Sequence, residues 1–164
     1  MFDFFKNTVY LRIKPNWLSV LQVETWHEYG DVPALAIEQK NGKKVVVAVG
    51  RKATKMSGMP NIIVVDGFKH PRTIIADFSV AELTVKHYLK QVLSGSWFMV
   101  SPIMVIHPQV SLEGGLTQVE IRALVELGIG AGARKVYVWE GPELTKEELR
   151  ELRFSRTSGK LLHP

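Results

Sequence analysis

The sequence predicts an α/β fold in which an antiparallel meander of strands is followed by a parallel β–α–β unit. The clearest evidence lies in residues 103–139, where two apolar runs, 103–106 and 136–139, flank a helical pattern. Thr117 and Glu120 form a capping box at the start of that pattern. Runs that are apolar on successive residues are typical of strands covered on both faces, so we expect two parallel neighbours joined by a crossover helix.

The first part of the chain supplies the meander. Alternating β-formers and turn residues predict strands at 9–13, 18–23, 33–39 and 43–49, and a further apolar run lies at 62–65. Lys14-Pro15-Asn16 and Asn41-Gly42 are the turns within this region, and the second is a strong hairpin signal. Because connections this short join antiparallel neighbours, we expect four strands in one meander.

Two more helices carry their own start signals. Ser79 and Glu82 form a second capping box, and apolar residues at helical spacing continue the pattern to Val92. Thr145 and Glu148 form a third capping box, which opens a short charged helix.

The chain divides into three regions. Residues 1–8 are expected to be an N-terminal tail, residues 9–154 a single subdomain, and residues 155–164 a frayed basic C-terminal tail. At 164 residues the chain is long enough for one domain with a real core.

Composition excludes several classes of protein. There is no cysteine, so there is no disulfide framework and no thiolate nucleophile. No apolar run approaches the roughly 20 residues that cross a bilayer. The net charge of +5 is modest, and no nucleic-acid-binding motif is present, so no nucleic-acid partner is expected. These features favour a cytoplasmic protein.

The N-terminus offers a candidate membrane contact. Phe2, Phe4 and Phe5 fall within the first five residues and could lie at the inner face of a membrane. The alternative is a tail that is disordered or packed onto the body, because Lys6 and Asp3 provide no net positive charge.

No metal site is predicted. The five histidines are far apart and have no partner at ligand spacing, and His107 is expected to be a hydrogen-bonded histidine at the edge of the sheet. The glycine-rich segment 128–132 ends a helix and leads into a strand, so it is a C-cap and turn and not a dinucleotide-binding loop.

Three separated segments, residues 46–56, 74–92 and 117–142, occur in an order that resembles the family of the bacterial actin homologue MreB, which determines rod shape. The similarity covers most of residues 9–142. It implies the first half of domain I, an actin-like (ribonuclease-H-like) subdomain IA built on a mixed five-stranded sheet.

The resemblance also implies where ATPase chemistry would lie. In this family, a first hairpin offers a carboxylate toward magnesium and glycine amides toward phosphate. The matching positions here hold Arg12, Lys14 and Pro15, and Pro15 has no amide hydrogen. Arg12 and Lys14 could bind phosphate directly, or they could be ordinary exposed charges of the turn.

The second implied position precedes a proline. Relatives carry a glutamate there that orients the attacking water, whereas this chain has Gly141 before Pro142, and Glu140 lies one residue early. The second phosphate loop, the adenine pocket and all of domain II have no counterpart in the sequence. We therefore expect no catalytic residue, and we expect the isolated chain not to bind ATP with magnesium.

These observations favour a non-catalytic, actin-like partial domain that acts by protein–protein contact. The resemblance suggests an MreB-type filament as partner, and a homodimer is also expected because a subdomain without its usual neighbour should leave an apolar flank. Two alternatives stay open: a nucleotide-binding half-site completed by another chain, and a basic module that binds a membrane surface.

Overall fold

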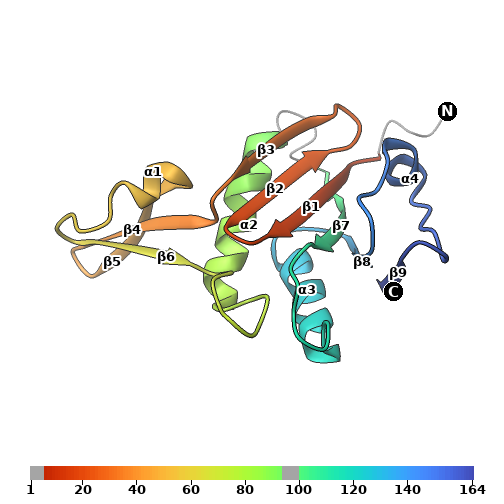
Figure 1. Cartoon of the computed structure of the whole chain (residues 1–164). Helices are drawn as coiled ribbons and strands as arrows, with labels where there is room; N and C mark the ends of the chain where they lie inside the picture. Colours follow the sequence, from red (N-terminus) through yellow and green to blue (C-terminus); the bar gives the residue numbers. More distant parts are fainter. Residues whose placement is uncertain (1–5, 94–99) are drawn as a thin grey trace.

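The computed structural model describes residues 6–93 and 100–164, in which nine strands form two sheets (Figure 1). The large sheet has the strand order β3-β2-β1-β7-β8-β9. Its strands are β1 (Thr8–Lys14), β2 (Trp17–Gln22), β3 (His27–Asp31), β7 (Ile103–Pro108), β8 (Lys135–Glu140) and β9 (Lys160–His163). The small sheet has the order β5-β4-β6, formed by β4 (Ala34–Lys40), β5 (Lys43–Val49) and β6 (Ile62–Asp66).

Four helices accompany these sheets: α1 (Arg51–Thr54), α2 (Phe78–Val92), α3 (Gln118–Gly130) and α4 (Lys146–Glu151). In the part of the chain that is described, no helix combines the length and the apolar character needed to cross a membrane.

The predicted β–α–β unit is confirmed. β7 and β8 pair in parallel, α3 connects them, and β1 pairs in parallel with β7 on the other side. Both halves of the capping box at the start of α3 are present: Glu120 N–H donates to the Thr117 hydroxyl at 3.2 Å, and Thr117 N–H donates to the Glu120 carboxylate at 2.8 Å. α3 ends at Gly130, within the glycine-rich segment.

The predicted four-strand meander is wrong in its second half. β1, β2 and β3 form the antiparallel meander of the large sheet, whereas the β4–β5 hairpin pairs with β6 in a separate sheet. β3 escaped prediction because its sequence, His-Glu-Tyr-Gly-Asp, lacks apolar alternation, as suits a strand at the edge of a sheet. The large sheet therefore has six strands and not the expected five, and residues 9–154 contain two sheets.

The start of α2 also differs from the prediction. Asp77 is the N-cap, and its carboxylate accepts a hydrogen bond from Val80 N–H at 3.0 Å. Ser79 lies inside the first turn, and Glu82 forms an i,i+4 ion pair with Lys86. Asp77 satisfies the unpaired amide of the first turn in place of the expected serine.

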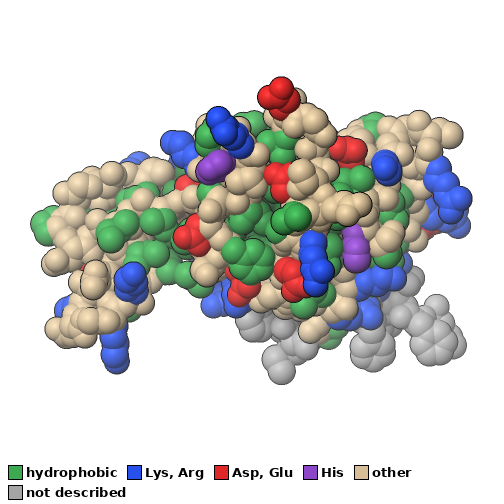
Figure 2. Space-filling view, turned by 90° about the horizontal axis from the view of Figure 1, so that it is seen from below, with side chains coloured by type: hydrophobic (Ala, Val, Ile, Leu, Met, Phe, Trp, Pro, Cys, Tyr) green, Lys and Arg blue, Asp and Glu red, His purple; other side chains and the backbone are tan. Residues whose placement is uncertain are grey.

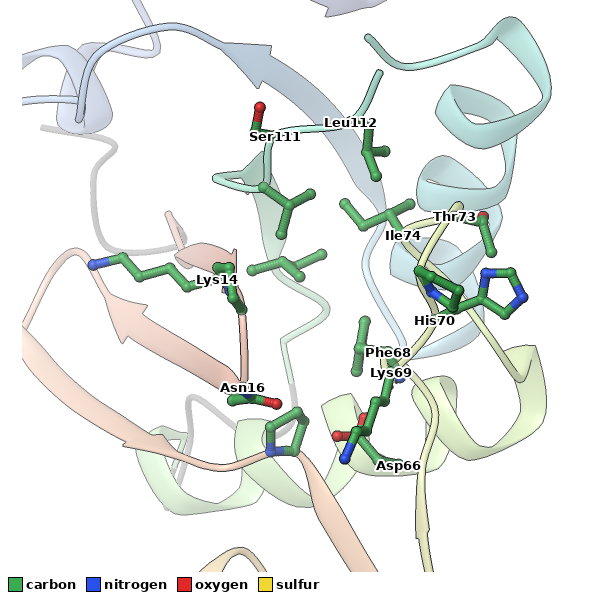
Figure 3. A pocket seen from close by; sticks show the side chains of 15 residues that line it. Lys14, Asn16, Asp66, Phe68, Lys69, His70, Thr73, Ile74, Ser111 and Leu112 are labelled. Carbon is green, nitrogen blue, oxygen red and sulfur yellow. Dashed lines mark hydrogen bonds between the residues drawn. The ribbon is translucent and has the colours of Figure 1, made fainter. Parts of the chain in front are cut away.

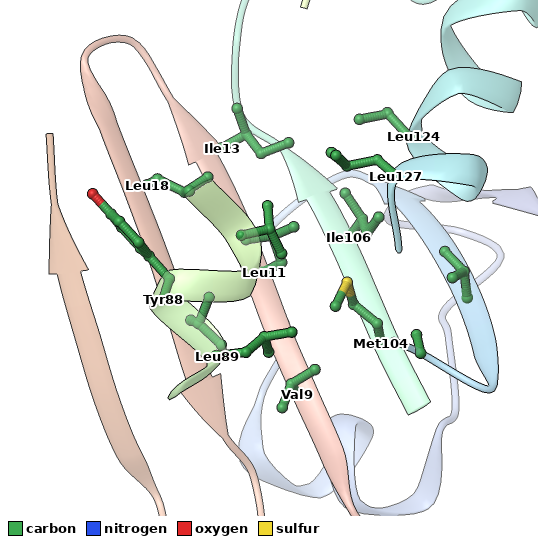
Figure 4. Packing of buried hydrophobic residues seen from close by; sticks show 14 of the residues in the cluster. Val9, Leu11, Ile13, Leu18, Tyr88, Leu89, Met104, Ile106, Leu124 and Leu127 are labelled. Atoms are coloured by element: carbon green, nitrogen blue, oxygen red, sulfur yellow. The ribbon is translucent and has the colours of Figure 1, made fainter. Parts of the chain in front are cut away.

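The main core lies between the large sheet and two helices. Val9, Leu11 and Ile13 of β1 alternate toward this side, where α2 and α3 cover them (Figure 4). The two helices contribute, among others, Tyr88 and Leu127, both fully buried. The Tyr88 hydroxyl also donates to the carbonyl of Val32 at 2.6 Å, which ties α2 to the junction between the two sheets.

The second face of the large sheet has its own smaller core. Tyr10, Val105 and Trp139 point to this face. They pack with Leu144, just before α4, and with Leu149 of α4. β9 then adds an antiparallel edge strand beside β8. The expectation of a frayed tail from residue 155 is therefore wrong, because residues 160–163 complete the sheet.

Candidate functional site

The positions singled out in the sequence meet where the carboxyl ends of the parallel strands lie together. The β1–β2 turn brings Lys14 and Pro15, β7 leads into Gln109, and β8 leads into Gly141. Ligand sites of open α/β sheets commonly occupy this edge. Alternation along β1 divides the region into a polar cluster on the face of α4 and a cavity on the face of α2 and α3.

Arg12 is the centre of the polar cluster. Its guanidinium forms ion pairs with Glu28 of β3 and, at 2.9 Å, with Glu143 of the turn after β8. It also donates to the Ser19 hydroxyl at 3.2 Å, and it lies over the ring of Tyr10. The Arg12 side chain is only 14% exposed, so the interpretation as an exposed turn charge is wrong for this residue. Glu28 and Glu143 already pair with the guanidinium that a phosphate would need as its partner.

Lys14 and Pro15 are placed differently from Arg12. The Lys14 ammonium lies 3.9 Å from Glu143 and is about half exposed, and its side chain points away from the residues of the cavity (Figure 3). Pro15 and Asn16 form the tip of the turn, where Asn16 has a positive φ of 55°. Lys14 is thus an exposed charge of the turn, and whether it binds phosphate stays a prediction.

A chain of hydrogen bonds crosses the cluster beneath Arg12. The Tyr10 hydroxyl lies 2.6 Å from His107 Nδ1, and His107 Nε2 lies 2.8 Å from the carbonyl of Gly141. Leu144 N–H donates to the same hydroxyl at 3.3 Å. Because the Gly141 carbonyl can only accept, Nε2 carries the proton, and the Tyr10 hydroxyl donates to Nδ1.

A neutral imidazole fits this arrangement, because its unprotonated Nδ1 can accept from the Tyr10 hydroxyl. Burial lowers the pKa of His107, because the charged form would lose its hydration. Burial also raises the pKa of Tyr10 to about 12, so the hydroxyl keeps its proton. The expected edge position of His107 is wrong: β7 lies between β1 and β8, and the ring is 1% exposed.

The position of the relatives' glutamate has no room for a side chain. A Cβ on Gly141 would lie 2.8 Å from Trp139 Cζ2 and 2.9 Å from Gly159 Cα, and the φ of Gly141 is +154°. Glu140 ends β8 and is exposed, so it does not replace the missing carboxylate within the cluster. The structure thus brings Arg12 and Gly141 into one region but leaves Glu140 outside it.

Several residues of the polar cluster were not singled out in the sequence, among them Glu143 and Gln109. The Gln109 amide donates to the Glu143 carboxylate at 3.2 Å. This bond, followed by the contact with Arg12, holds the pKa of Glu143 below its usual range. The available signal was that Glu143 directly follows Pro142, so a carboxylate does lie at the end of β8, two residues beyond Gly141.

A cavity of about 660 Å³ lies on the other side of the β1–β2 turn (Figure 3). Ile13, Phe68 and Ile74 supply apolar wall, and Asp66 and Lys69 supply charges of opposite sign. The Asp66 carboxylate accepts a hydrogen bond from Phe68 N–H at 2.8 Å, and burial raises its pKa. The cavity is large enough for a small organic ligand with both apolar and charged parts.

Neither side of this region holds a metal centre. Across residues 6–93 and 100–164, no group of three or more histidine or acidic side chains is placed to bind a metal ion. The candidate membrane contacts Phe2, Phe4 and Phe5 lie outside the described residues.

The order of strands, with a three-strand meander joined in parallel to a β–α–β unit, defines an actin-like fold. Two solved structures of MreB 5 of Spiroplasma citri, bound to AMPPNP and to ADP, superpose with a TM-score of 0.63. The AMPPNP structure is 19% identical in sequence, and the match covers 81% of this chain and 38% of that one. This likeness establishes the fold.

Sequence comparison gives the family. The MreB/Mbl protein family matches residues 29–145, and the chain belongs to that family. It is similar to the cell shape-determining proteins MreB of Haemophilus influenzae (38% identical over 113 residues) and MreB of Escherichia coli K12 (39% over 113). It is also similar to Mbl of Bacillus subtilis (30% over 112). These matches cover 67–68% of this chain and 30–31% of each relative, so the chain spans about a third of their length.

The family match leaves out both ends of the chain, including the β1–β2 hairpin and α4. It begins at residue 29, after the β1–β2 hairpin, and ends at residue 145, before α4. The correspondence of Arg12, Lys14 and Pro15 with a phosphate-binding hairpin therefore stays a prediction. The residues that cover the second face of the sheet, from Lys146 onward, lie beyond the matched region.

Proposed function

We propose that this chain is a non-catalytic MreB-like partial domain that acts by protein–protein contact within the cell-shape machinery, with an MreB-type filament as its partner. The observation that carries the proposal is the packing around Gly141, which leaves no space for the carboxylate that a hydrolytic site requires there. Membership of a family whose relatives are named cell shape-determining proteins supports the process.

The electrostatics of the polar cluster support the same conclusion. Hydrolysis of a triphosphate needs an acidic ligand for magnesium and free donors for the transferred phosphoryl group. At the corresponding edge this chain places Arg12, which is held by Glu28 and Glu143, and the amide-free Pro15. A metal ion at this edge would be repelled by the guanidinium of Arg12. A phosphate would have to displace Glu28 and Glu143 from that guanidinium.

The second face of the large sheet is not the surface for the proposed contact. Leu144, Leu149 and Phe154 pack on the second face of the large sheet, so the chain covers this apolar surface itself. A partner must therefore bind elsewhere on the molecule.

Co-sedimentation with polymerised MreB of a relative tests the partner, and phosphate release with magnesium and ATP tests catalysis. We expect the chain to pellet only with filaments, and to release no phosphate above the background of a buffer control. A chain that stays in the supernatant at every filament concentration would remove the proposed partner. Turnover by the isolated chain, retained through repurification, would remove the non-catalytic assignment.

A second candidate is a nucleotide-binding half-site that another chain completes. The cavity beside the β1–β2 turn favours it, because Asp66, Lys69 and Ser111 line a space of about 660 Å³. Calorimetric titration of magnesium and ATP, with and without polymerised MreB, tests this candidate. Binding that appears only in the mixture and is lost in Lys69→Ala, but not in the exposed control Lys55→Ala, would support it.

The proposal places the protein in the cytoplasm, at the inner face of the membrane. Phe2, Phe4 and Phe5 are the candidate contacts with lipid. Flotation with anionic vesicles tests this placement: recovery in the lipid fraction should be lost when residues 1–6 are deleted, and unchanged recovery would contradict the role of the phenylalanines.

A further inference from the structure

The small sheet ends in two edge strands, β5 and β6. Within residues 6–93 and 100–164, no further strand pairs with the outer side of either one. An edge strand presents unpaired N–H and C=O groups, so proteins usually protect it with lysines, prolines or bulges. The two edges of this sheet differ in that protection.

β5 carries two of these protective features. It begins with Lys43 and Lys44, both exposed, and its pairing with β4 contains a register shift next to Ala36 and Ile37. A charged, irregular edge of this kind resists addition of another strand.

β6 carries none of them. Residues 62–65 are four consecutive β-branched apolar residues, Ile-Ile-Val-Val, without lysine or proline. Ile63 is 54% exposed, and hydrophobic side chains gather over the small sheet in the view from below (Figure 2). Over residues 62–65 this edge combines high β-propensity with uncharged side chains, and Asp66 is the only charged residue of the strand.

The register with β4 shows which backbone groups of β6 point outward. Gln39 N–H donates to the Asn61 carbonyl at 3.0 Å, and Ile63 and Val65 stand opposite Ile37 and Leu35. Because hydrogen-bonded pairs alternate along an antiparallel ladder, the groups of residues 61, 63 and 65 face β4. Those of residues 62, 64 and 66 face outward.

The outward groups form a self-complementary set. The N–H of Ile62 is already bonded to the Met59 carbonyl at 3.2 Å. The groups left for a partner are therefore the carbonyl of Ile62, both groups of Val64 and the N–H of Asp66. Val64 lies at the centre, with an acceptor two residues before it and a donor two residues after it.

We propose that β6 pairs antiparallel with β6 of a second copy of this chain, about a two-fold axis at Val64. The two Val64 residues exchange N–H···O=C bonds, and each Asp66 N–H donates to the Ile62 carbonyl of the other copy. In this register Ile63 stands beside Val65 of the partner subunit as a non-hydrogen-bonded pair, where side chains approach closely. The dimer joins two three-stranded sheets into one of six strands.

A second copy fits this edge better than continued head-to-tail pairing. Addition of β6 to the β5 edge of another copy would repeat without limit, and Lys43 and Lys44 oppose it. Pairing of β6 with itself closes after two copies and leaves both charged edges outside. The proposal uses no residue of the polar cluster, and of the residues that line the cavity it uses only the backbone N–H of Asp66, so it is tested independently of the filament partner proposed above.

Engineered cysteines test the register, because the sequence contains no cysteine. Ile63→Cys and Val65→Cys chains, distinguished by a mass tag, are mixed and oxidised. We expect a disulfide-linked heterodimer and no cross-linking of either variant alone, since like positions lie beyond the reach of a disulfide. A mixture of Val45→Cys and Val47→Cys, on β5, is the matched control and should stay uncross-linked. Absence of the heterodimer in the first mixture would overturn the proposal.

Sedimentation equilibrium tests the association itself. Ile63→Lys should weaken the dimer at least tenfold, because a charge then lies against Val65 of the partner subunit. Val45→Lys adds the same charge to a comparably exposed residue (53%) of β5 and should leave the dimer unchanged. Circular dichroism establishes that both variants are folded. A wild-type chain that is monomeric at its highest soluble concentration, or equal weakening by both lysines, would overturn the proposal.

Discussion

At the scale of single residues, Gly141 and His107 are held in one arrangement at the carboxyl ends of the parallel strands. Both belong to a hydrogen-bonded connection between β1, β7 and the turn after β8, in which the bond from Tyr10 to His107 is buried and the bond from His107 to Gly141 is partly buried. The connection leaves Gly141 without space for a side chain and His107 without a free nitrogen.

Replacement of Gly141 should destabilise the fold. In Gly141→Ala the new methyl group meets Trp139 and Gly159, and the positive φ adds strain, so we expect a loss of about 1–3 kcal/mol in the free energy of unfolding. Gly141→Glu, which restores the relatives' residue, should lose more and gain no ATP hydrolysis. Urea denaturation measures the first effect, and Glu140→Gln, at an exposed site, should change stability by less than about 0.5 kcal/mol.

His107 should make stability depend on pH in a defined window. Burial lowers the pKa of His107 in the folded state below 6.5. As the pH falls, the histidine is therefore protonated in the unfolded chain before it is protonated in the folded one. Stability is therefore complete above about pH 6.5 and falls as the pH drops from there to the folded-state pKa, by at most about 1.4 kcal/mol per pH unit for one proton. The lowered pKa of Glu143 acts in a separate window, below its usual value of 4.5.

Paired variants isolate the contribution of His107. Denaturation of His107→Gln between pH 5 and 8 should show a shallower dependence than wild type, whereas His87→Gln removes only the part from the partly buried His87, whose pKa burial and Lys90 also lower. Identical slopes for His107→Gln and wild type would contradict the neutral, buried imidazole.

The sequence indicated which residues deserved attention at this scale but not what they contact. The resemblance implied an acidic residue at the position of Arg12 and a glutamate at that of Gly141, and both correspondences stay predictions. The partners of Arg12, Glu28 and Glu143, lie 16 and 131 residues away, so no local pattern could join them. The burial of His107 was missed because its neighbours come from two other strands.

At the scale of elements, prediction succeeded where local signals decide the structure. The crossover helix, its capping box and the capping box of α4 were all correct. β3 and β9 were missed because both are short edge strands without apolar alternation, β3 being polar and β9 only four residues long, and pairing with a neighbour stabilises them. The N-cap of α2 was misplaced by two residues because both Asp77 and Ser79 are good caps, and the preceding chain decides between them.

That choice of cap can be measured. Asp77→Ala removes the acceptor for Val80 N–H and should cost about 1 kcal/mol in the free energy of unfolding. Ser79→Ala, two residues on and inside the helix, should cost less than about 0.5 kcal/mol. The reverse order of the two effects would show that the helix begins at the serine in solution.

α4 should contribute to stability although it lies beyond the family match. Leu149 is fully buried against the second face of the sheet, so Leu149→Ala should cost about 2–5 kcal/mol. Glu147→Gln, on the exposed side of the same helix, is the control and should be nearly neutral. If thermal denaturation shows the same loss of stability for both variants, α4 does not cover the second core in solution.

At the scale of the whole molecule, the two sheets should differ in local stability. The strands β1 and β7 lie in the interior of the large sheet, between two cores, whereas the small sheet has a single minor cluster around Ala34, Ala36 and Ala53. Amides of β4 and β5 should therefore exchange with solvent faster than those of β1 and β7 in hydrogen-exchange measurements. Uniform protection of both sheets would contradict this difference.

The fold class could be predicted because several separated segments agreed with one known family. The division into two sheets could not, since the chain passes from β3 to β4 with no composition change that marks a boundary. The surfaces available for binding were also beyond prediction, because no local pattern in residues 144–154 indicates which face of the sheet they cover.

The position of β9 has a consequence for synthesis. Trp139 packs against Phe154, and β8 gains its outer neighbour only from residues 160–163. During translation, a nascent chain that has reached residue 140 has most of the partners of α2 and α3, but it lacks β9 and exposes an indole and an unpaired strand. That interval, and not the mature protein, is when this polypeptide has most need of a chaperone.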